Sequence, residues 1–174
     1  MEQTVINEVW RSVDGYMNYQ VSNIGRVRNA TNGRILKATL NNGYYKVTVG
    51  NHEGQKRYCV HTLVAQEFLD KPDSKHDTYY VDHINRNKLD NQVCNLRYAT
   101  ASQNMMNKTK QIGRKTSSQY KGVTLEKKSG KWIAQIRIGG KRNYLGIFTS
   151  EEEAAMAYDL KAEEAHGEFA VLNF

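Results

Sequence analysis

Four side chains in residues 82–104 have the types and the spacing that phosphodiester hydrolysis requires. Asp82 and His83 are adjacent, and Asn95 and Asn104 follow 12 and 21 residues after the histidine. A neutral imidazole can deprotonate water near neutral pH, and oxygen ligands can hold a divalent cation that neutralises the expelled oxygen. We therefore predict His83 as the general base, with Asp82 and Asn104 supplying the oxygen ligands.

The surrounding segments predict a strand, a loop, a second strand and a helix. Residues 78–82 and 96–99 are rich in β-branched and aromatic side chains and flank a polar loop, so they can pair as a hairpin. Residues 100–103 have the Thr and Gln spacing of a capping box, which predicts a helix that carries Asn104. Such a ββα unit can bring strand and helix residues together, while Asn95 can hydrogen-bond across the loop base and orient the imidazole.

The sequence VDHINRNKLDNQVCNLRYATASQNMMNK, preceded by YCVHTLVAQEF, resembles the HNH nuclease family, in the branch of phage and intron homing endonucleases. The resemblance implies His83 as general base, Asp82 and Asn104 as metal ligands, and Asn95 as a structural residue. It also implies a ββα-metal nuclease fold and cleavage that leaves a 5′ phosphate and a 3′ hydroxyl. Arg97 is implied as a phosphate clamp.

The metal expected from this resemblance is Mg²⁺, with Mn²⁺ as an alternative. Asn104 takes the place of the histidine that the last letter of HNH denotes, as in the variant of the family that ends in Asn. This implies weak metal binding through a carboxylate, an amide and phosphate oxygens. His61 is expected to pack or to tether the backbone. Cys59, His61, His83 and Cys94 could be considered as zinc ligands. These lack the paired-Cys spacing of structural zinc sites, so no zinc is expected.

The length allows one ordinary domain or two to three small ones, and the motifs favour several small domains in the α+β class. The chain has 174 residues and two cysteines 35 residues apart, which offer no disulfide framework. No apolar run approaches 18 residues and MEQTVINEVW lacks a signal-peptide pattern, so we expect a cytoplasmic protein without a membrane partner. The predicted domains are a β-rich module (1–55), the nuclease (56–107), a basic linker (108–119) and a C-terminal domain (120–174).

The net charge of +7 is unevenly distributed. Residues 105–149 carry eleven Lys or Arg against one acid, whereas residues 150–168 carry seven acids and one Lys. A basic surface of this kind attracts a polyanion through counterion release, with steep salt dependence. A solvated basic surface is the alternative, because charge runs alone do not prove binding.

The C-terminal segment alternates polar and apolar residues in three stretches and then becomes helical. The stretches predict three antiparallel strands, and a capping box at residues 150–153 with Gly167 as the stop predicts one helix.

The same segment resembles the Apetala-type (ethylene-response-factor) DNA-binding domain. The resemblance is carried by YKGV, GKWIAQIRI, YLGIFTSEEEAAMAYDLKA and GEFAVLNF. The resemblance implies four DNA contacts from the sheet: Lys121, Arg137, Arg142 and Tyr144. Thr124 replaces the usual Arg and Ser129 the usual Trp, so the plant target sequence is not implied. Trp132 is expected in the core.

The N-terminal segment EVWRSVDGYMNYQVSNIGRVRN resembles the nuclease-associated modular motif of homing endonucleases. A hairpin is predicted around residues 23–25, followed by further strands and by a helix at about 62–68. The expected core residues share apolar side chains and comprise Trp10, Val21, Val27, Ile35, Leu36, Val47 and Val49. Four cations are candidates for the DNA backbone, with solubilising charge as the alternative: Arg26, Arg28, Arg34 and Lys46.

Together these features predict a site-specific, metal-dependent endonuclease acting on double-stranded DNA. One catalytic unit in one chain favours a monomer that nicks one strand, encoded by a phage or another mobile element. The main alternative is a sequence-specific DNA-binding regulator with an inactive nuclease unit. An RNA-binding or packaging accessory protein is a further alternative, because the same charge would serve it.

Overall fold

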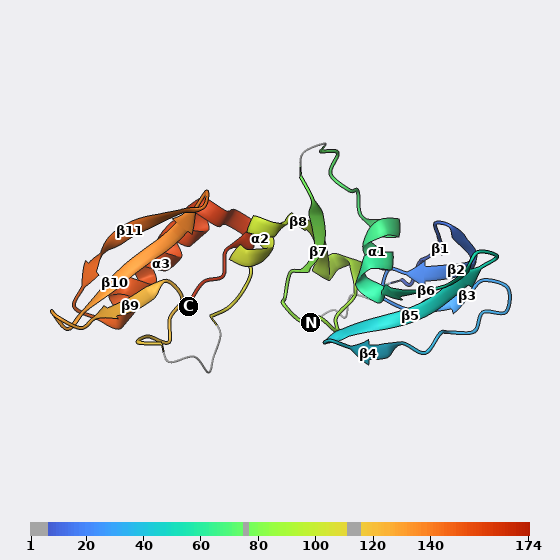
Figure 1. Ribbon diagram of the computed structural model, residues 1–174, viewed down its shortest axis with the longest axis horizontal. Coiled ribbons are helices and arrows are strands. Elements are labelled where there is room, and N and C mark those ends of the chain that lie inside the picture. Colours follow the sequence, from blue (N-terminus) through green and yellow to red (C-terminus); the bar gives the residue numbers. More distant parts are fainter. Residues whose placement is uncertain (1–6, 75–76, 111–115) are drawn as a thin grey trace. The chain divides into compact units, whose positions relative to one another are not determined.

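The computed structural model describes residues 7–74, 77–110 and 116–174 (Figure 1). The chain divides into two compact units, Met1–Ala101 and Ser102–Phe174. The described residues combine helices with several small antiparallel sheets, so the predicted α+β class is confirmed. Part of the predicted linker at 108–119 lies outside the described residues. Within the described residues, no helix has the length and apolar character needed to span a membrane.

The first unit contains two three-stranded sheets, two short helices and a hairpin. Its strands are β1 (Trp10–Val13), β2 (Tyr16–Ser22), β3 (Val27–Asn29), β4 (Thr39–Asn41), β5 (Tyr44–Asn51), β6 (Gly54–Cys59), β7 (Tyr79–His83) and β8 (Leu96–Thr100). Its helices are α1 (Val60–Phe68) and the 3₁₀ turn η1 (Val93–Asn95). The predicted hairpins and the helix near 62–68 are therefore present, although α1 begins two residues earlier than expected.

A single hydrophobic core joins the sheets of this unit to α1. The core residues come from β1–β3, from β5, from α1 and from β8: Val13, Val21, Val27, Val47, Val49, Val60, Leu63, Val64 and Leu96. Helix α1 contacts β1, β2 and β5, so it fills the space between the two three-stranded sheets. Residues of the expected N-terminal module and of the expected nuclease are thus packed together.

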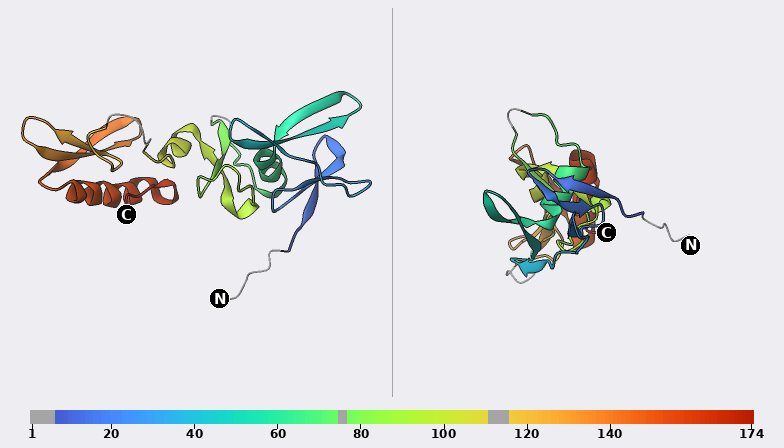
Figure 2. Two further views of the ribbon diagram at one scale, coloured as in Figure 1. Left: turned by 90° about the horizontal axis from the view of Figure 1, so that it is seen from below. Right: turned by 90° about the vertical axis from the view of Figure 1, so that its right-hand side faces the viewer.

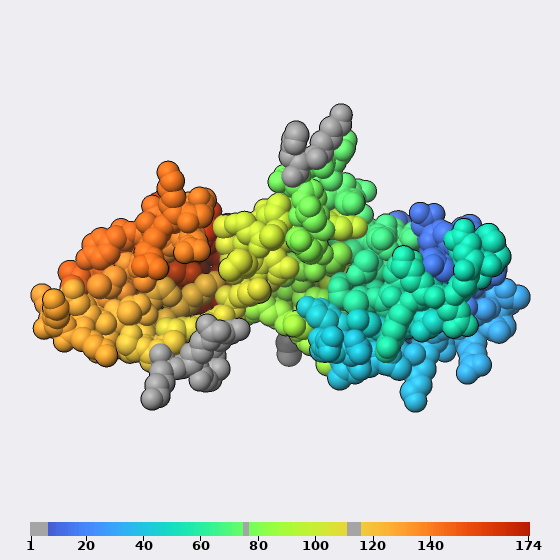
Figure 3. Space-filling model, in the orientation of Figure 1, coloured from blue at the N-terminus to red at the C-terminus, as the bar shows by residue number. Residues whose placement is uncertain are grey.

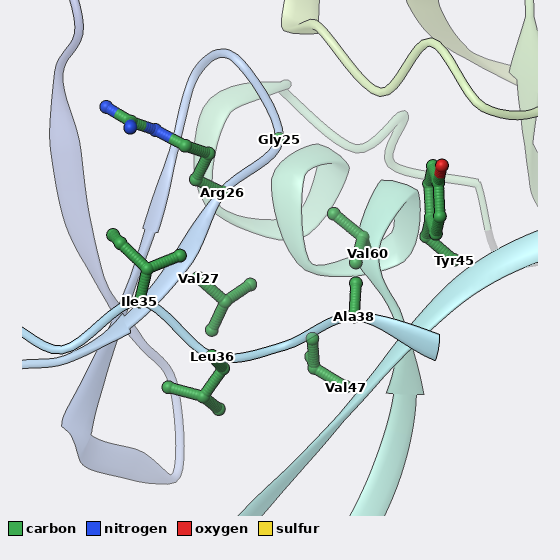
Figure 4. A pocket seen from close by; sticks show the side chains of 9 residues that line it. All are labelled: Gly25, Arg26, Val27, Ile35, Leu36, Ala38, Tyr45, Val47 and Val60. Atoms are coloured by element: carbon green, nitrogen blue, oxygen red, sulfur yellow. The ribbon is translucent and has the colours of Figure 1, made fainter. Parts of the chain in front are cut away.

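One expected core residue lies at the surface. Ile35 is 44% exposed, whereas Leu36 packs against the core. Ile35 forms an isolated bridge with Arg28 outside the regular strands, and its side chain lines an open apolar hollow of about 180 Å³ (Figure 4). Ile35 and Leu36 are adjacent, so extended backbone turns their side chains to opposite sides, and only Leu36 faces the core.

The second unit begins with α2 (Ala101–Met106), which crosses the boundary, and continues with a sheet and a helix. The sheet contains β9 (Val123–Glu126), β10 (Lys131–Ile138) and β11 (Lys141–Phe148) in the order β11-β10-β9. Helix α3 (Glu151–His166) follows and is succeeded by η2 (Gly167–Phe169). Figure 2 shows α3 lying along one face of the sheet.

Small residues let α3 lie close to the sheet. Ala154, Ala155 and Ala162 are fully buried against β10. Gly122 has a φ of +79°, and a Cβ there would clash with the Tyr158 ring. This contact explains physically why the YKGV sequence has glycine at that position.

The predicted caps of α3 are present in the structure. The Ser150 hydroxyl accepts hydrogen bonds from the backbone N–H groups of Glu152 and Glu153, and Gly167 ends the helix with a φ of 51°. Trp132, which we expected in the core, packs against the buried residues of β9, β10 and α3.

Candidate active site

The β7–β8 hairpin holds the adjacent Asp82 and His83 at the end of a strand. In the antiparallel register, Asp82 lies opposite Arg97 and His83 lies opposite Leu96. Both predicted functional side chains are buried, with 7% of Asp82 and 5% of His83 exposed. Buried polar side chains require hydrogen-bonding partners, and those partners fix the geometry of the site.

The His83 imidazole is oriented by a residue that we did not predict. His83 Nε2 lies 3.1 Å from Asn91 Oδ1, and the Asn91 amide nitrogen donates to the backbone oxygen of Leu89 at 3.3 Å. The second contact makes Oδ1 the amide atom that faces the ring, and an amide oxygen only accepts. With Oδ1 facing the ring, Nε2 is the His83 nitrogen that donates in this contact.

Asn95 ties together the two ends of the loop between β7 and β8. Its Oδ1 accepts from the backbone N–H of Asn85 at 2.9 Å, and its Nδ2 donates to the backbone oxygen of Asp90 at 2.8 Å. The backbone oxygen of Asn95 also accepts from Ile84 N–H at 2.9 Å. These bonds cross the loop base as expected, and they support the loop that carries Asn91.

Asp82 forms a buried ion pair with Arg97. Arg97 Nε lies 3.1 Å from Asp82 Oδ2, and only about a tenth of each side chain is exposed, at 10% and 8%. The pair fixes the direction of the carboxylate. A phosphate contact by Arg97 stays a prediction, because in this structure its guanidinium faces the acidic side chain.

His61 and Tyr44 form an aromatic wall around His83. The His61 ring meets the His83 ring edge to face with centroids 5.0 Å apart, and the Tyr44 ring lies 6.2 Å from the same ring. Burial, together with the neighbouring His83, lowers the pKa of His61 to about 4. His61 is consequently neutral near pH 7 and adds no positive charge beside His83.

The donor set around Asp82 fits a hard cation held only partly by protein. No cluster of three or more His, Cys, Asp or Glu residues able to hold a metal occurs within the described residues. Mg²⁺ commonly uses one or two carboxylates and completes its coordination with water and substrate phosphates. Asn104 lies on α2 in the second unit, so its pairing with Asp82 stays a prediction.

The outer face of the C-terminal sheet carries three of the four predicted DNA contacts. The even-numbered residues 132–138 of β10 pack toward α3, which leaves Arg137 on the opposite face, directly across from Arg142. Tyr144 lies on the same face and is 63% exposed. In Figure 3 the strand side chains of this unit, coloured orange, cover most of α3.

Two equally charged side chains in direct cross-strand register oppose folding. Two neighbouring cations on an exposed face attract an anion. Lys121 differs from the other three predicted contacts, because its ammonium donates to the backbone oxygen of Met106 at 2.6 Å.

Two of the N-terminal cations bind other side chains of the protein, whereas others line a groove at the surface. Arg26 pairs with Glu8, and Arg28 bonds Gln20 and stacks over Trp10 at 4.1 Å. A groove on β4–β6 instead gathers three cations with two threonines, lined by Leu36, Lys37, Thr39, Lys46, Thr48 and Arg57. Of the predicted backbone contacts, Lys46 therefore has the setting best suited to phosphate.

Three protein families match successive parts of the chain. Residues 8–50 match the NUMOD4 motif, residues 58–106 match the HNH endonuclease family, and residues 118–168 match the AP2 domain.

The similar proteins include HNH endonucleases and AP2-like transcription factors. An uncharacterized HNH endonuclease of Acanthamoeba polyphaga mimivirus is 35% identical over 115 residues, which cover 64% of this chain and 34% of that protein. An AP2-like ethylene-responsive transcription factor of Arabidopsis thaliana is 42% identical over 90 residues, which cover 44% of this chain and 16% of that protein. The chain thus spans about a third or less of the length of these two relatives.

A solved structure extends the likeness over most of the chain. The HNH homing endonuclease I-HmuI, in a structure described as showing DNA binding and cleavage, matches with a TM-score of 0.52 at 26% identity, covering 91% of both chains. The chain thus matches in succession the NUMOD4 motif, the HNH endonuclease family and the AP2 domain, each over its own segment.

Proposed function

We propose that this protein is a metal-dependent DNA endonuclease that acts at specific sites and cuts one strand, leaving a 5′ phosphate and a 3′ hydroxyl. The observation that carries the proposal is the buried His83 imidazole, held at Nε2 by Asn91 beside the Asp82 carboxylate. A general base must present one nitrogen to water in a fixed orientation. The HNH family match and the likeness to I-HmuI support the same reaction.

In the proposed reaction, His83 Nδ1 takes the proton from the attacking water. The Nε2–H donor stays on Asn91 Oδ1 as the imidazolium forms, so the ring keeps its direction. Neutral His61 packs against the ring without repelling the new positive charge. Arg97 meanwhile holds the Asp82 carboxylate in place.

A divalent metal, for which we propose Mg²⁺, would neutralise charge on the expelled sugar oxygen. Asp82 and Asn104 are the residues proposed to hold it, with substrate phosphate oxygens completing the coordination. Asp82 supplies a carboxylate whose Oδ2 accepts a hydrogen bond from Arg97 Nε at 3.1 Å.

Recognition of a long site is proposed for the surfaces outside the nuclease domain. The groove on β4–β6 and the outer face of β10 and β11 both present cations to solvent. Such contacts help an enzyme select its site among the many competing sites of a genome. We further propose that one chain acts as a monomer, in the cytoplasm of the cell that hosts its phage or mobile element.

The proposal is tested with supercoiled plasmid and with phage DNA in Mg²⁺, with and without chelator. His83→Ala should lower the nicking rate by about 10²-fold to 10⁴-fold, the usual contribution of a general base. His52→Ala is the matched control, because His52 lies exposed in the turn between β5 and β6. It should nick at the unaltered rate, and both variants should retain DNA binding.

Product formation at the same rate by His83→Ala would contradict the role of His83. Tight DNA binding by the unaltered protein, without product in Mg²⁺ or Mn²⁺, would favour the regulator instead. End-labelled DNA then gives the strand and the position of each cut.

A further inference from the structure

The turn between β2 and β3 lies directly against the loop that carries Asn91. Gly25 in this turn has a φ of +85°, and a Cβ at that position would lie 2.8 Å from Asn91 Cβ and 3.1 Å from the Asn91 backbone oxygen. Atoms this close must move apart. The atoms that would have to move belong to the backbone and the first side-chain carbon of Asn91, which cannot swing aside as the end of a long side chain can.

A backbone hydrogen bond joins the same two segments. The Val93 N–H donates to the backbone oxygen of Asn23 at 2.8 Å. The turn therefore contacts the loop between β7 and β8 at two places. Gly25 lies against Asn91, and Asn23 accepts the hydrogen bond from Val93. These two contacts hold the turn and the loop at a fixed distance within the first unit, although they lie far apart in the sequence.

The turn is itself held from several directions. Asn23 Oδ1 accepts from Val9 N–H at 2.8 Å, and its amide nitrogen donates to the Asn7 backbone oxygen at 3.1 Å. The Gly25 N–H donates to the Ser22 backbone oxygen at 3.0 Å, and the fully buried Ser22 hydroxyl accepts from Arg26 N–H at 3.0 Å. A turn with this many bonds can act as a rigid support.

We propose that the turn at residues 22–26 positions the catalytic base, by setting Asn91 at hydrogen-bonding distance from His83 Nε2. The N-terminal module then contributes to the hydrolytic step in addition to any contact with DNA. Asn91 and Gly25 are positioning residues in this scheme, since they act on water only through the His83 ring. The proposal rests on the proposed function in one respect, which is the role of His83 as general base.

The decisive variant is Gly25→Ala, compared with Gly15→Ala. Both glycines have positive φ values, +85° and +70°, so alanine strains the backbone at each. Only at Gly25 does the new methyl group meet Asn91, because nothing in the described residues lies within 4 Å of a Cβ at Gly15. The comparison therefore separates displacement of Asn91 from backbone strain.

Gly25→Ala should lower the single-turnover nicking rate by about 10-fold to 100-fold relative to Gly15→Ala, because catalysis is sensitive to displacements below 1 Å. The DNA dissociation constant should be equal for both variants. Asn91→Ala should show the same loss of rate as Gly25→Ala. Asn91→Asp keeps an acceptor oxygen for His83 Nε2 but loses the donor to the Leu89 backbone oxygen, so it should restore part of the rate.

A second measurement reads the ring directly. Long-range ¹H–¹⁵N spectra of the His83 imidazole should show the Nε2–H form in the unaltered protein and in Gly15→Ala, and a mixture of tautomers in Gly25→Ala and Asn91→Ala. Equal rates and equal ring spectra for the two glycine variants would overturn the proposal. If the unaltered protein does not cut DNA, the proposed function fails, and the ring spectra alone decide whether the turn positions His83. If Gly25→Ala does not fold, Asn23→Ala takes its place, because it removes the bonds of the turn to Val9 and Asn7, and an unchanged rate and ring spectrum for it would overturn the proposal.

Discussion

At the scale of single residues, the two neighbouring imidazoles have different tasks. His83 is bonded to a side-chain acceptor, whereas the buried Nδ1 of His61 has no hydrogen-bonding partner in the described residues. Burial disfavours the charged form of an imidazole, which accounts for the lowered pKa of His61. His61 thus supports the base by packing and remains uncharged where the enzyme is proposed to work.

The lowered pKa of His61 predicts acid sensitivity of the fold. The folded pKa of about 4 lies below the ordinary value of 6.5, so the unfolded chain binds the proton more tightly. The contribution of neutral His61 to the free energy of unfolding is complete above pH 6.5 and is lost as the pH falls from 6.5 toward 4. Between pH 7 and pH 5 this residue should cost about 2 kcal/mol of unfolding free energy.

His61→Phe keeps a ring and removes the titration, so it should reduce this loss. Urea unfolding at pH 7 and at pH 5, for the unaltered protein and for His61→Phe, gives the comparison. The same pH dependence in both proteins would show that other groups cause it.

At the scale of elements, the hairpin of β7 and β8 converts spacing in the sequence into contact in space. Its register sets Asp82 directly opposite Arg97, and the loop that it closes brings Asn91 back to His83. The register of the hairpin accounts for the first pair. The second contact depends on the loop, whose path is fixed by the Asn95 bonds and by the turn at residues 22–26.

Removing the cation of the buried pair should destabilise the first unit. Arg97→Ala removes the guanidinium and leaves the Asp82 carboxylate buried. Such a change typically lowers the free energy of unfolding by about 3–5 kcal/mol. Arg97→Lys should cost less, because it keeps the charge but loses the planar geometry. Arg34→Ala, at an exposed position, should change the stability by less than about 0.5 kcal/mol. Equal urea midpoints for Arg97→Ala and Arg34→Ala would show that the pair contributes nothing to stability.

At the scale of the whole molecule, cationic surfaces occur in both units while the candidate base lies in the first. The groove on β4–β6 belongs to the first unit and the outer face of β10 and β11 to the second. Each surface can bind phosphate by itself, so affinity for DNA should have contributions from both. Removing the cations of one surface should weaken DNA binding and leave the function of His83 as general base intact.

Arg137→Ala tests the contribution of the C-terminal sheet. It should weaken DNA binding and reduce the slope of log affinity against log salt by about one, as expected for one lost phosphate contact. The stability should not fall, because Arg137 lies opposite another arginine. Lys161→Ala is the control, since this lysine lies on α3 and pairs with Glu164. An identical salt slope for both variants would exclude the sheet from the DNA interface.

The sequence by itself determined the elements and the residue types of the site. Alternation predicted the strands, and the Ser150 cap and the Gly167 stop were predicted correctly because helix ends depend on nearby residues. Asp82 and His83 could be selected because an adjacent acid and imidazole in a hairpin have a chemical meaning. Local rules were sufficient wherever the partners are close in the sequence.

The tertiary structure alone decided which residues support His83. Asn91 lies in a loop rich in Asn and Asp, where each such residue is equally suited to a turn, so no local signal distinguishes it. Gly25 likewise has the pattern of an ordinary hairpin glycine, and its contact with Asn91 spans 66 residues of sequence. Such contacts depend on how the sheets pack around α1, because packing joins segments that no spacing rule connects.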